Sequence, residues 1–553
     1  MTRAYVLATW AIAIALMAAI DASAFPITRL LPASPPLPDG AVRRFGSAVP
    51  ATAVPELPGG DLRRVGRSRE STAGAAMTAT ADGRRLFVAD TTGRVDVFDV
   101  ATGQRERRLQ EPSKDSIHVM AVSPDGRWLA CGRTRGDIQL WDLTTHKAVR
   151  LMNDRADADQ ERRGIVERLA FSSDSKVLFS GIDPFMGAEN AGASAWDIST
   201  GKKLWTMPGV GYNVAADPRG RFVLTGVLGQ ETPRVSLLDA ATGRLVRSFN
   251  VESSFEPGAE GGEVVEVSAT MDRRFTPDGQ RLVSYHDDGT VRLWDIATAK
   301  ELVRMKTGPT GSPMPGGLAC SPDSRWIAIR SDRTVQIWEL SSGRKLHTIM
   351  GLEAAPRDLA FTADGRGLIV SASSTPVLWT VKPKDRPRID RPLGELWEEL
   401  GAEDAGKAYR LIWALIDDPK TAIRIAAANV HPAEMAIDKS KFDRLALALD
   451  APRFAARERA EVELLRAGIT VPVAWLRNAQ VETKSEEVRA RLDRILVARQ
   501  TGGPRQWRFE RMIQVLEFVG TEDSKKLLND WAAGPPGGFL TEAAAQAVVR
   551  VSR

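Results

Sequence analysis

The chain contains few of the residues that build metal sites and disulfide frameworks. Among its 553 residues it has 2 cysteines, Cys131 and Cys320, and 5 histidines. A zinc site needs Cys and His clustered at ligand spacing, whereas the histidines here are scattered singly. We therefore expect no metal site. Each cysteine lies within an apolar run, which is typical of a buried thiol.

The chain also lacks a strong excess of charge of one sign. It carries 75 Lys and Arg against 70 Asp and Glu, for a net charge of +5. Basic residues mostly alternate with acidic ones, as in Arg457–Glu461. A nucleic-acid-binding protein concentrates its basic residues in a patch. The composition therefore predicts a mixed, solvated surface and no nucleic-acid partner.

Catalytic signatures are absent as well. The chain has no Gly-x-Ser-x-Gly elbow between a strand and a helix, and no phosphate-cradling glycine loop with a lysine. Asp287 and Asp288 could form an acid/base pair, but with His286 they occupy a turn between two strand-like runs, and turn chemistry explains them better. We expect no catalytic residues, no cofactor and no enzyme activity.

Long hydrophobic runs are missing except at the N-terminus. Arg3 precedes the apolar run Ala4–Ile20, and Ala22-Ser23-Ala24 matches the small-residue pattern of signal cleavage. This pattern predicts a signal peptide over residues 1–24 and a soluble periplasmic or secreted protein. The alternative is an uncleaved N-terminal anchor, since the run is near the lower limit for crossing a bilayer.

Residues 25–60 are rich in Pro, Ala, Ser and Gly. Such a composition cannot bury a core and favours extended chain. We expect a disordered linker there.

One sequence pattern then recurs seven times between residues 61 and 382, with a period of about 40 to 60 residues. Each copy has a turn signal such as Asp278-Gly279 and, later, an apolar run that usually ends in Trp, such as Trp294-Asp295. The repeat around these residues reads as four short strands separated by Gly- and Asp-containing turns. Four antiparallel strands per repeat predict a mainly β fold, a seven-bladed β-propeller.

These repeats resemble the WD40 family. The matching pieces are Ser123–Gly126, Asp288–Asp295 and the Asp-x-x-Thr-Gly turns at Asp99–Gly103, Asp197–Gly201 and Asp239–Gly243. Most repeats lack the family's Gly-His dipeptide, and one repeat ends in Leu238 in place of Trp. We therefore expect the family's buried hydrogen-bond set to be incomplete in several blades, with apolar packing between blades as compensation. The Trp residues at 141, 196, 294, 338 and 379 are expected to be packing residues.

The seventh repeat stops at Lys382 and lacks a fourth strand of its own. The stretch Leu62–Val65 resembles the fourth strands of other repeats, such as Lys203–Trp205. We predict that it completes the last blade and so removes an open strand edge.

From residue 393 to 553 the spacing of apolar residues changes to that of helices, as in Ala405, Ala408, Leu411, Ile412 and Leu415. Short loops between helices suggest stacked antiparallel pairs. This region resembles the HEAT-like helical domain that follows WD40 rings in some bacterial exported proteins.

Three insertions lengthen the third to fifth repeats: Asn153–Gly164, Asp183–Ala193 and Asn250–Met271. Their connections emerge on one face of the ring, and loops on rigid scaffolds often bind partners. We predict a protein-binding site with apolar anchors in an acidic rim. Its candidate residues are Phe185, Met186, Phe255, Glu256, Glu260 and Glu263. Mobile loops without a function are the alternative.

The leading interpretation is a non-catalytic protein–protein interaction scaffold outside the cytoplasm, monomeric, with partners bound by the propeller loops and the helical tail. The alternative is an enzymatic or small-ligand-binding propeller with a site in its central channel. That site would need polar residues on the first strands, which read as mostly apolar, for example Val119–Val122 and Leu359–Phe361.

Overall fold

The computed structural model describes residues 40–45, 76–90, 92–110, 116–133, 136–152, 164–182, 192–208, 214–227, 234–250, 270–286, 288–308, 317–352, 354–371, 376–432 and 437–552. The chain divides into Met1–Pro36, which lies outside these ranges, and one compact unit, Leu37–Arg553.

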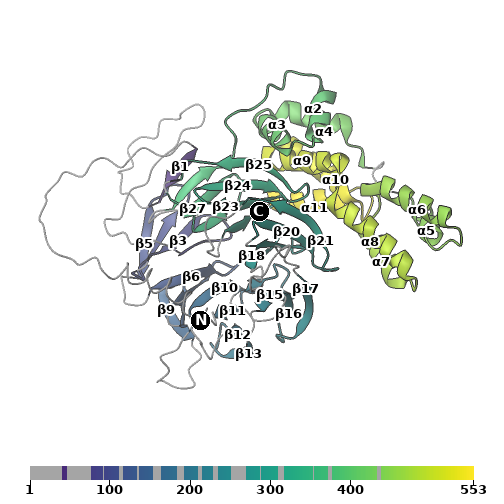
Figure 1. The fold of residues 1–553 in the computed structure, drawn as a ribbon. Coiled ribbons are helices and arrows are strands. Elements are labelled where there is room, and N and C mark those ends of the chain that lie inside the picture. Colours follow the sequence, from purple (N-terminus) through teal and green to yellow (C-terminus); the bar gives the residue numbers. More distant parts are fainter. Residues whose placement is uncertain are drawn as a thin grey trace, which may run out of the picture. The chain divides into compact units, whose positions relative to one another are not determined.

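The β region consists of seven four-stranded antiparallel sheets, which are the blades of a propeller (Figure 1). Blades 1 to 6 are formed by consecutive strands. Blade 1 contains β2 (Ala76–Ala79), β3 (Arg85–Ala89), β4 (Val95–Asp99) and β5 (Arg105–Gln110). Blade 2 contains β6 (Ile117–Val122), β7 (Trp128–Arg133), β8 (Ile138–Asp142) and β9 (Lys147–Met152). Blade 3 contains β10 (Val166–Phe171), β11 (Val177–Ile182), β12 (Gly192–Asp197) and β13 (Lys203–Pro208).

Blade 4 contains β14 (Ala215–Ala216), β15 (Phe222–Val227), β16 (Arg234–Asp239) and β17 (Leu245–Asn250). Blade 5 contains β18 (Thr270–Phe275), β19 (Arg281–His286), β20 (Thr290–Asp295) and β21 (Glu301–Lys306). Blade 6 contains β22 (Leu318–Cys320), β23 (Trp326–Ser331), β24 (Thr334–Glu339) and β25 (Arg344–Ile349). Each first strand contacts the first strand of the next blade, so the seven blades close into a ring. The predicted seven-bladed propeller is confirmed.

Blade 7 is completed by a strand from the N-terminal side of the ring, but not by the predicted one. Its own strands are β26 (Asp358–Phe361), β27 (Gly367–Ser371) and β28 (Val377–Thr380), and its fourth is β1 (Ala41–Arg44). The prediction of Leu62–Val65 is therefore wrong, and that segment lies outside the described residues. β1 also lies within the range 25–60, so the prediction of a disordered linker is wrong at Ala41–Arg44.

Packing explains why β1 fits this position. The fully buried Ala41 pairs with Trp379. Gly40 has a φ of 97°, and a Cβ atom added to it would lie 3.5 Å from the Trp379 ring. Phe45 is fully buried at the seam with blade 1, where it meets Phe98 edge to ring at 6.1 Å between centroids. Arg43 donates to the Val100 carbonyl of blade 1 at 2.9 Å. One strand thus fastens blade 7 to blade 1 and closes the ring.

Apolar side chains fill every seam between neighbouring blades. Seven separate clusters of buried residues join blades 1 and 2, 2 and 3, 3 and 4, 4 and 5, 5 and 6, 6 and 7, and 7 and 1. The five predicted Trp residues are buried in these seams. The apolar packing expected between blades is confirmed. Burial at about 25 cal/mol per Å² makes these seams the main source of stability for the ring.

Ten helices follow within residues 393–551 of the described chain. They are α2 (Leu393–Leu400), α3 (Ala405–Asp417), α4 (Pro419–Asn429), α5 (Lys439–Ala448), α6 (Phe454–Ala467), α7 (Val473–Glu482), α8 (Glu486–Thr501), α9 (Pro504–Val519), α10 (Glu522–Ala532) and α11 (Phe539–Val551). Several start where the sequence supplies a cap. Thr521 accepts from the Ser524 amide at α10, and Asp418 accepts from the Thr421 amide at α4.

The helices form two cores that differ from a simple stack. The first core combines α2, α3 and α4 with α9, α10 and α11, and α9 contacts all five of the others. The second core belongs to α5, α6, α7 and α8, which lie between these groups in the sequence. Consecutive helices do pack in pairs, as α5 with α6 and α7 with α8. The return of α9 onto the first three helices departs from the sequential packing of a repeat array.

Candidate functional site

The ring has two faces that differ in their connections. Within each blade the first-to-second and third-to-fourth turns emerge on one face, where the Asp-containing turns lie; we call it the turn face. The second-to-third connections and those between blades emerge on the other, which we call the insertion face because all three long insertions belong to it. All six candidate binding residues fall within those insertions and lie outside the described residues. They are Phe185, Met186, Phe255, Glu256, Glu260 and Glu263.

The helices dock on the turn face of blades 5 to 7. The contact is centred on Trp326 of blade 6, whose ring meets those of Tyr409 and Trp413 on α3 and Phe518 on α9 at centroid distances of 5.2, 6.4 and 5.9 Å. All four side chains are buried. The Tyr409 hydroxyl donates to the carbonyl of Val381, just after the last strand. The propeller and the first helical core therefore share one apolar cluster.

A buried ion pair lies beside this aromatic cluster. Arg511 of α9 donates to both carboxylate oxygens of Glu339, at 2.8 and 2.6 Å. Its remaining nitrogen donates to the carbonyls of Leu400 and Ala402 at 2.7 and 3.1 Å. Arg511 is 1% exposed and Glu339 4%. Glu339 stands where other repeats carry Asp after Trp, and its longer side chain reaches the helical domain.

Further polar contacts extend the interface along the same face. Gln514 donates to Asp323 at 2.7 Å, and Arg325 pairs with Glu517 at 3.0 Å. Burial by itself raises the pKa of Asp323, yet Arg325 and the Ser321 hydroxyl hold that pKa below its usual value. In blade 5, Asp295 accepts from Arg477 of α7 at 2.9 Å and from Gln500 of α8 at 2.6 Å. Both helical cores thus contact the ring.

Charged side chains meet on the axis of the ring, contrary to our interpretation of the first strands as mostly apolar. Arg168 of blade 3 lies 3.9 Å from the Asp272 carboxylate of blade 5. Because blade 4 separates these blades around the ring, the two side chains meet across the axis. Arg274 lies 3.6 Å from the other Asp272 oxygen. The charged run Asp272-Arg273-Arg274 is the sequence signal that could have pointed to this group.

Two more charged residues belong to this group. Asp358 at the start of blade 7 interacts electrostatically with Arg274 and Arg168, and Arg330 of blade 6 interacts with Asp272 and Asp358. Burial raises the pKa of Asp358 and lowers that of Arg330, whereas Asp272 raises the pKa of Arg274. We call Arg168, Asp272, Arg274, Arg330 and Asp358 the axial cluster. Asp358 starts its first strand and Arg330 lies near the end of a second strand, at the insertion-face end of the axis. Arg274 is the fifth of the six residues of β18, so the cluster extends from that end toward the middle of the axis.

Bulges shape the inner strands beside the axial cluster. The pairing register shifts at His118 in β6 and at Glu167 in β10. These two bulged residues face each other across blades 2 and 3, with His118 Nε2 3.0 Å from a Glu167 carboxylate oxygen. Bulges often re-aim side chains next to functional sites. Here they bring an imidazole and a carboxylate together next to Arg168.

Comparison with known proteins identifies the repeats. The family model for the WD domain, G-beta repeat, matches residues 103–142, 261–295 and 302–339. A WD repeat-containing protein of Deinococcus radiodurans is 30% identical over 214 residues, which cover 36% of this chain and 75% of that protein. The chain belongs to the WD40 repeat family.

Other similarities are more distant. Actin-interacting protein 1 of Drosophila melanogaster is 26% identical over 280 residues, or 49% of this chain, but the chain spans only 41% of that WD40 relative. A chain of Kuenenia stuttgartiensis hydrazine synthase matches in structure with a TM-score of 0.45 and 16% identity, over 55% of this chain and 95% of that one. This last likeness is too weak to bear on function.

The WD40 hydrogen-bond set is present in some blades only. Trp294 donates to the Ser284 hydroxyl at 2.8 Å, and Ser284 in turn lies 2.8 Å from His286 Nε2. Trp196 donates to Ser180 at 2.8 Å. Among the described residues, the Trp141 and Trp379 indole nitrogens have no hydrogen-bond partner. The expectation of an incomplete set is confirmed.

His286 corrects one of our predictions. We assigned it to a turn, but it ends β19 and is fully buried. Burial, followed by the nearby Arg292, lowers its pKa to about 3. Asp288 does play the expected turn role, since it accepts from Thr290 and pairs with Arg292 at 2.9 Å. His286 therefore belongs to the WD40 core as a neutral imidazole.

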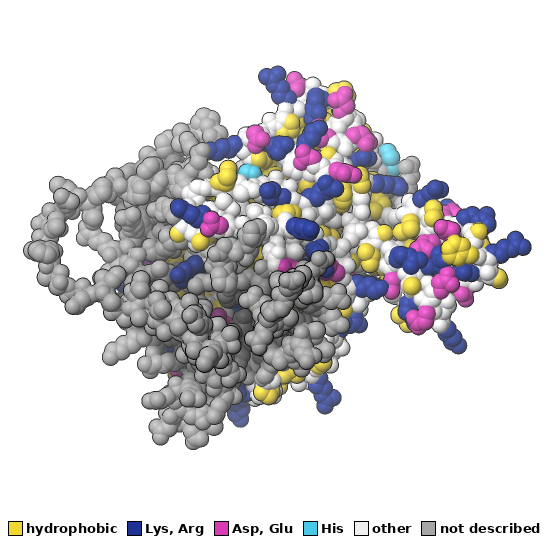
Figure 2. Space-filling view, viewed as in Figure 1, with side chains coloured by type: hydrophobic (Ala, Val, Ile, Leu, Met, Phe, Trp, Pro, Cys, Tyr) yellow, Lys and Arg dark blue, Asp and Glu magenta, His cyan; other side chains and the backbone are white. Residues whose placement is uncertain are grey.

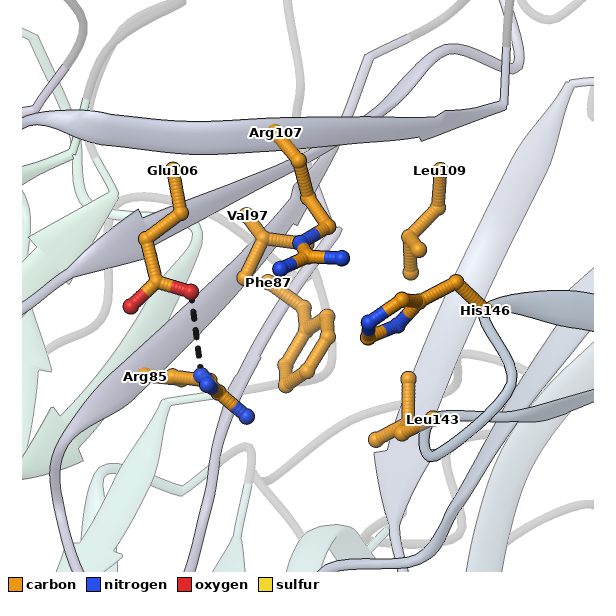
Figure 3. Close-up of a pocket in the computed structure, with 8 residues that line it drawn as sticks. All are labelled: Arg85, Phe87, Val97, Glu106, Arg107, Leu109, Leu143 and His146. Atoms are coloured by element: carbon orange, nitrogen blue, oxygen red, sulfur yellow. Dashed lines mark hydrogen bonds and ion pairs between the residues drawn. The ribbon is translucent and has the colours of Figure 1, made fainter.

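Outside the axis, a small pocket lies between the outer strands of blade 1 and a turn of blade 2 (Figure 3). Arg85 and Glu106 form an ion pair of 3.0 Å at its edge, and Arg107 and His146 point toward the Phe87 ring. Burial, then repulsion from Arg107, lowers the pKa of His146. The pocket is largely filled by its own side chains and offers little room for a ligand.

The described ranges hold neither a metal-binding cluster nor a membrane-crossing helix. They contain no group of three or more His, Cys, Asp or Glu residues that could hold a metal ion. Within the same ranges, no helix combines the length and apolar character that a bilayer crossing requires. Cys131 and Cys320 are thiols, and burial raises the pKa of each to about 12.

Proposed function

We propose that this WD40 protein is a non-catalytic interaction scaffold that binds a protein partner on the insertion face of the propeller and uses the helical domain as a second binding surface. The observation that supports this most directly is the side on which the helices dock. In the described residues their polar and aromatic contacts with the ring all fall on the turn face or its outer rim. The insertion face, with the insertions of blades 3 to 5, is thus on the opposite side of a rigid platform.

The helical domain contributes exposed apolar side chains. Leu447 of α5, Phe454 of α6 and Val481 of α7 are 77%, 60% and 84% exposed. They lie on the outside of helices α5 to α7, which project from the first helical core in Figure 1. This part of the molecule shows apolar side chains among interspersed acidic and basic ones in Figure 2. Apolar anchors within a polar surround are typical of protein-binding surfaces. We propose that α5 to α8, as HEAT-like helix pairs, bind a second protein.

We also propose that the chain is exported and acts in the periplasm or outside the cell as a monomer. The N-terminal pattern of Arg3, an apolar run and Ala22-Ser23-Ala24 supports export. Two binding surfaces on one chain would raise the effective concentration of one partner near the other.

The test replaces surfaces one at a time in the full-length exported protein. In one variant, short Asp-Gly turns replace all three insertions; in a second, Leu447→Glu and Val481→Glu alter the helical surface. Partners are captured from cells and quantified against the unmodified protein. We expect each variant to lose a different partner and to keep its thermal stability. The same partners captured in equal amounts by all three proteins would refute the proposal.

A further inference from the structure

We propose that the outer rim of blades 2 to 4 binds a helix of another protein, one that carries an acidic residue and, four positions later, an aliphatic one. The rim surface, as we call it, consists of β9, β13 and β17, the outermost strands of these blades. It is separate from the insertion face and takes a different partner. The inference rests on a two-residue pattern that the chain's own helices bind on blades 5 and 6.

The outer strands of five blades share this pattern of one basic and one apolar residue. In blades 2 to 6 the pairing between the third and fourth strands shifts once, and the residue left unpaired at the shift is aliphatic. A basic residue stands two positions before it. In chain order the pairs are Lys147 and Val149, Lys202 and Leu204, Arg244 and Val246, Lys300 and Leu302, and Arg344 and Leu346. Blade 1 has Gln104 and Glu106 at these positions and lacks the pattern.

Helix α8 binds both residues of the pattern on blade 5. Asp493 of α8 forms an ion pair with Lys300 at the start of the outer strand. Val497 of α8 packs against the apolar cluster that contains Leu302, and Leu302 is only 9% exposed. Residues four apart lie on the same face of a helix. One helix face thus meets the basic residue with a carboxylate and the apolar residue with an aliphatic side chain.

Helix α3 binds the pattern on blade 6 in a similar way. Glu403, two residues before α3, lies 3.4 Å from Arg344. Tyr409 of α3 belongs to the same buried cluster as Leu346, which is 7% exposed. The two helices come from different cores of the helical domain, yet both combine an acidic and an apolar contact. The pattern is therefore a helix-binding site wherever this molecule itself covers it.

The same pattern is uncovered on the rim surface. Val149, Leu204 and Val246 are 47%, 52% and 51% exposed. The basic residues that precede them are exposed as well, and none of the three forms an ion pair with another residue that the structure describes. Single aliphatic residues are common on protein surfaces, but these recur at the position that blades 5 and 6 bury under helices.

Charge and continuity identify the occupant. The strands β9, β13 and β17 contain basic residues but no Asp or Glu, so an acidic helix face complements them. Blade 4 adjoins blade 5, where α8 docks, so the rim surface continues an interface that the molecule already has. Because helices occupy the equivalent positions of blades 5 and 6, we expect a helix here and not an added strand.

The test maps what touches the rim surface in cells that produce the full-length protein. Leu204→benzoylphenylalanine places a photoreactive group there, and crosslinked peptides are sequenced by mass spectrometry. We expect a crosslink to a helix of another protein that carries the acidic and aliphatic residues four apart. Glu106→benzoylphenylalanine is the matched control, because Glu106 is exposed at the same unpaired position of blade 1; it should give no such crosslink.

Charge reversal then tests recognition. Lys202→Glu should lower the yield of the Leu204 crosslink roughly tenfold, since two like charges would face each other, and an acidic-to-Lys change in the partner should restore it. Replacing the three insertions with short turns should leave this crosslink unchanged, so the rim surface and the insertion face are tested separately. No crosslink, one confined to this chain or a second copy, one to a segment without the pattern, an equal yield from position 106, or an unchanged yield in Lys202→Glu would each overturn the proposal.

Discussion

The ion pair between Arg511 and Glu339 should control the attachment of the helical domain to the propeller. Arg511→Met removes two bonds to the carboxylate and two to backbone carbonyls, and it leaves Glu339 buried at 4% exposure without its partner. Breaking a buried pair on one side costs about 3–5 kcal/mol, because the remaining charge is uncompensated. We expect thermal denaturation of Arg511→Met to show a destabilisation of this size, and Glu339→Leu to show a similar one.

The double variant separates this cause from a simple loss of packing. Arg511→Met with Glu339→Leu leaves no buried charge, so it should be more stable than either single variant. Arg344 and Glu403 provide a control across the same interface. They lie 3.4 Å apart with 47% and 73% of their side chains exposed, and Arg344→Met should cost less than about 1 kcal/mol. A double variant as unstable as the sum of the two single ones, or an Arg511→Met as mild as the control, would refute this reasoning.

Three further predictions concern the ring. Phe45→Ala should lower the free energy of unfolding by about 3–5 kcal/mol in chemical denaturation, because a large aromatic side chain is lost from the seam that β1 closes. Deletion of residues 1–39 should leave the unfolding midpoint unchanged. Equal effects of the two changes would contradict the role of β1. Ala299 has a φ of 57°, in the left-handed region that is strained for a residue with a Cβ atom and relaxed for glycine. Ala299→Gly should therefore stabilise the protein by about 1 kcal/mol, and any loss of stability would contradict this. The pKa of His286 is about 3 when folded against 6.5 for a free imidazole, so the unfolded state binds the proton first. Stability should therefore fall as pH drops from 6.5 toward 3, and His286→Gln should reduce this fall; identical pH profiles would contradict it.

The sequence was most informative where one signal recurs in every repeat. Turn pairs such as Asp278-Gly279 and strand ends such as Trp294-Asp295 fix the blade pattern, because tight hairpins and inter-blade packing demand the same residue types each time. Helix caps such as Thr521, which accepts from the Ser524 amide, are equally local signals. Such local patterns carry their own physical cause, so no knowledge of distant contacts is needed.

Prediction failed where a role depends on a distant partner. Nothing local separates Ala41–Arg44 from Leu62–Val65 as a closing strand; the fit of Ala41 and Phe45 against other blades decides it.

The charged residues of the axis were missed for the same reason. Arg168 and Asp272 are far apart in the sequence and meet only because the ring closes. The same holds for Arg511 and Glu339, whose pairing depends on how the helices dock on the ring.

The most direct test of the account is hydrogen–deuterium exchange on the full-length protein with and without its captured partner. We predict that binding slows exchange in residues 153–163, 183–191 and 251–269 and at the starts of the first strands beside them, with the turn face of blades 1 to 4 unchanged. Protection confined to the turn face, with the three insertions unaffected, would contradict the claim that the insertion face is where this WD40 ring holds its partner.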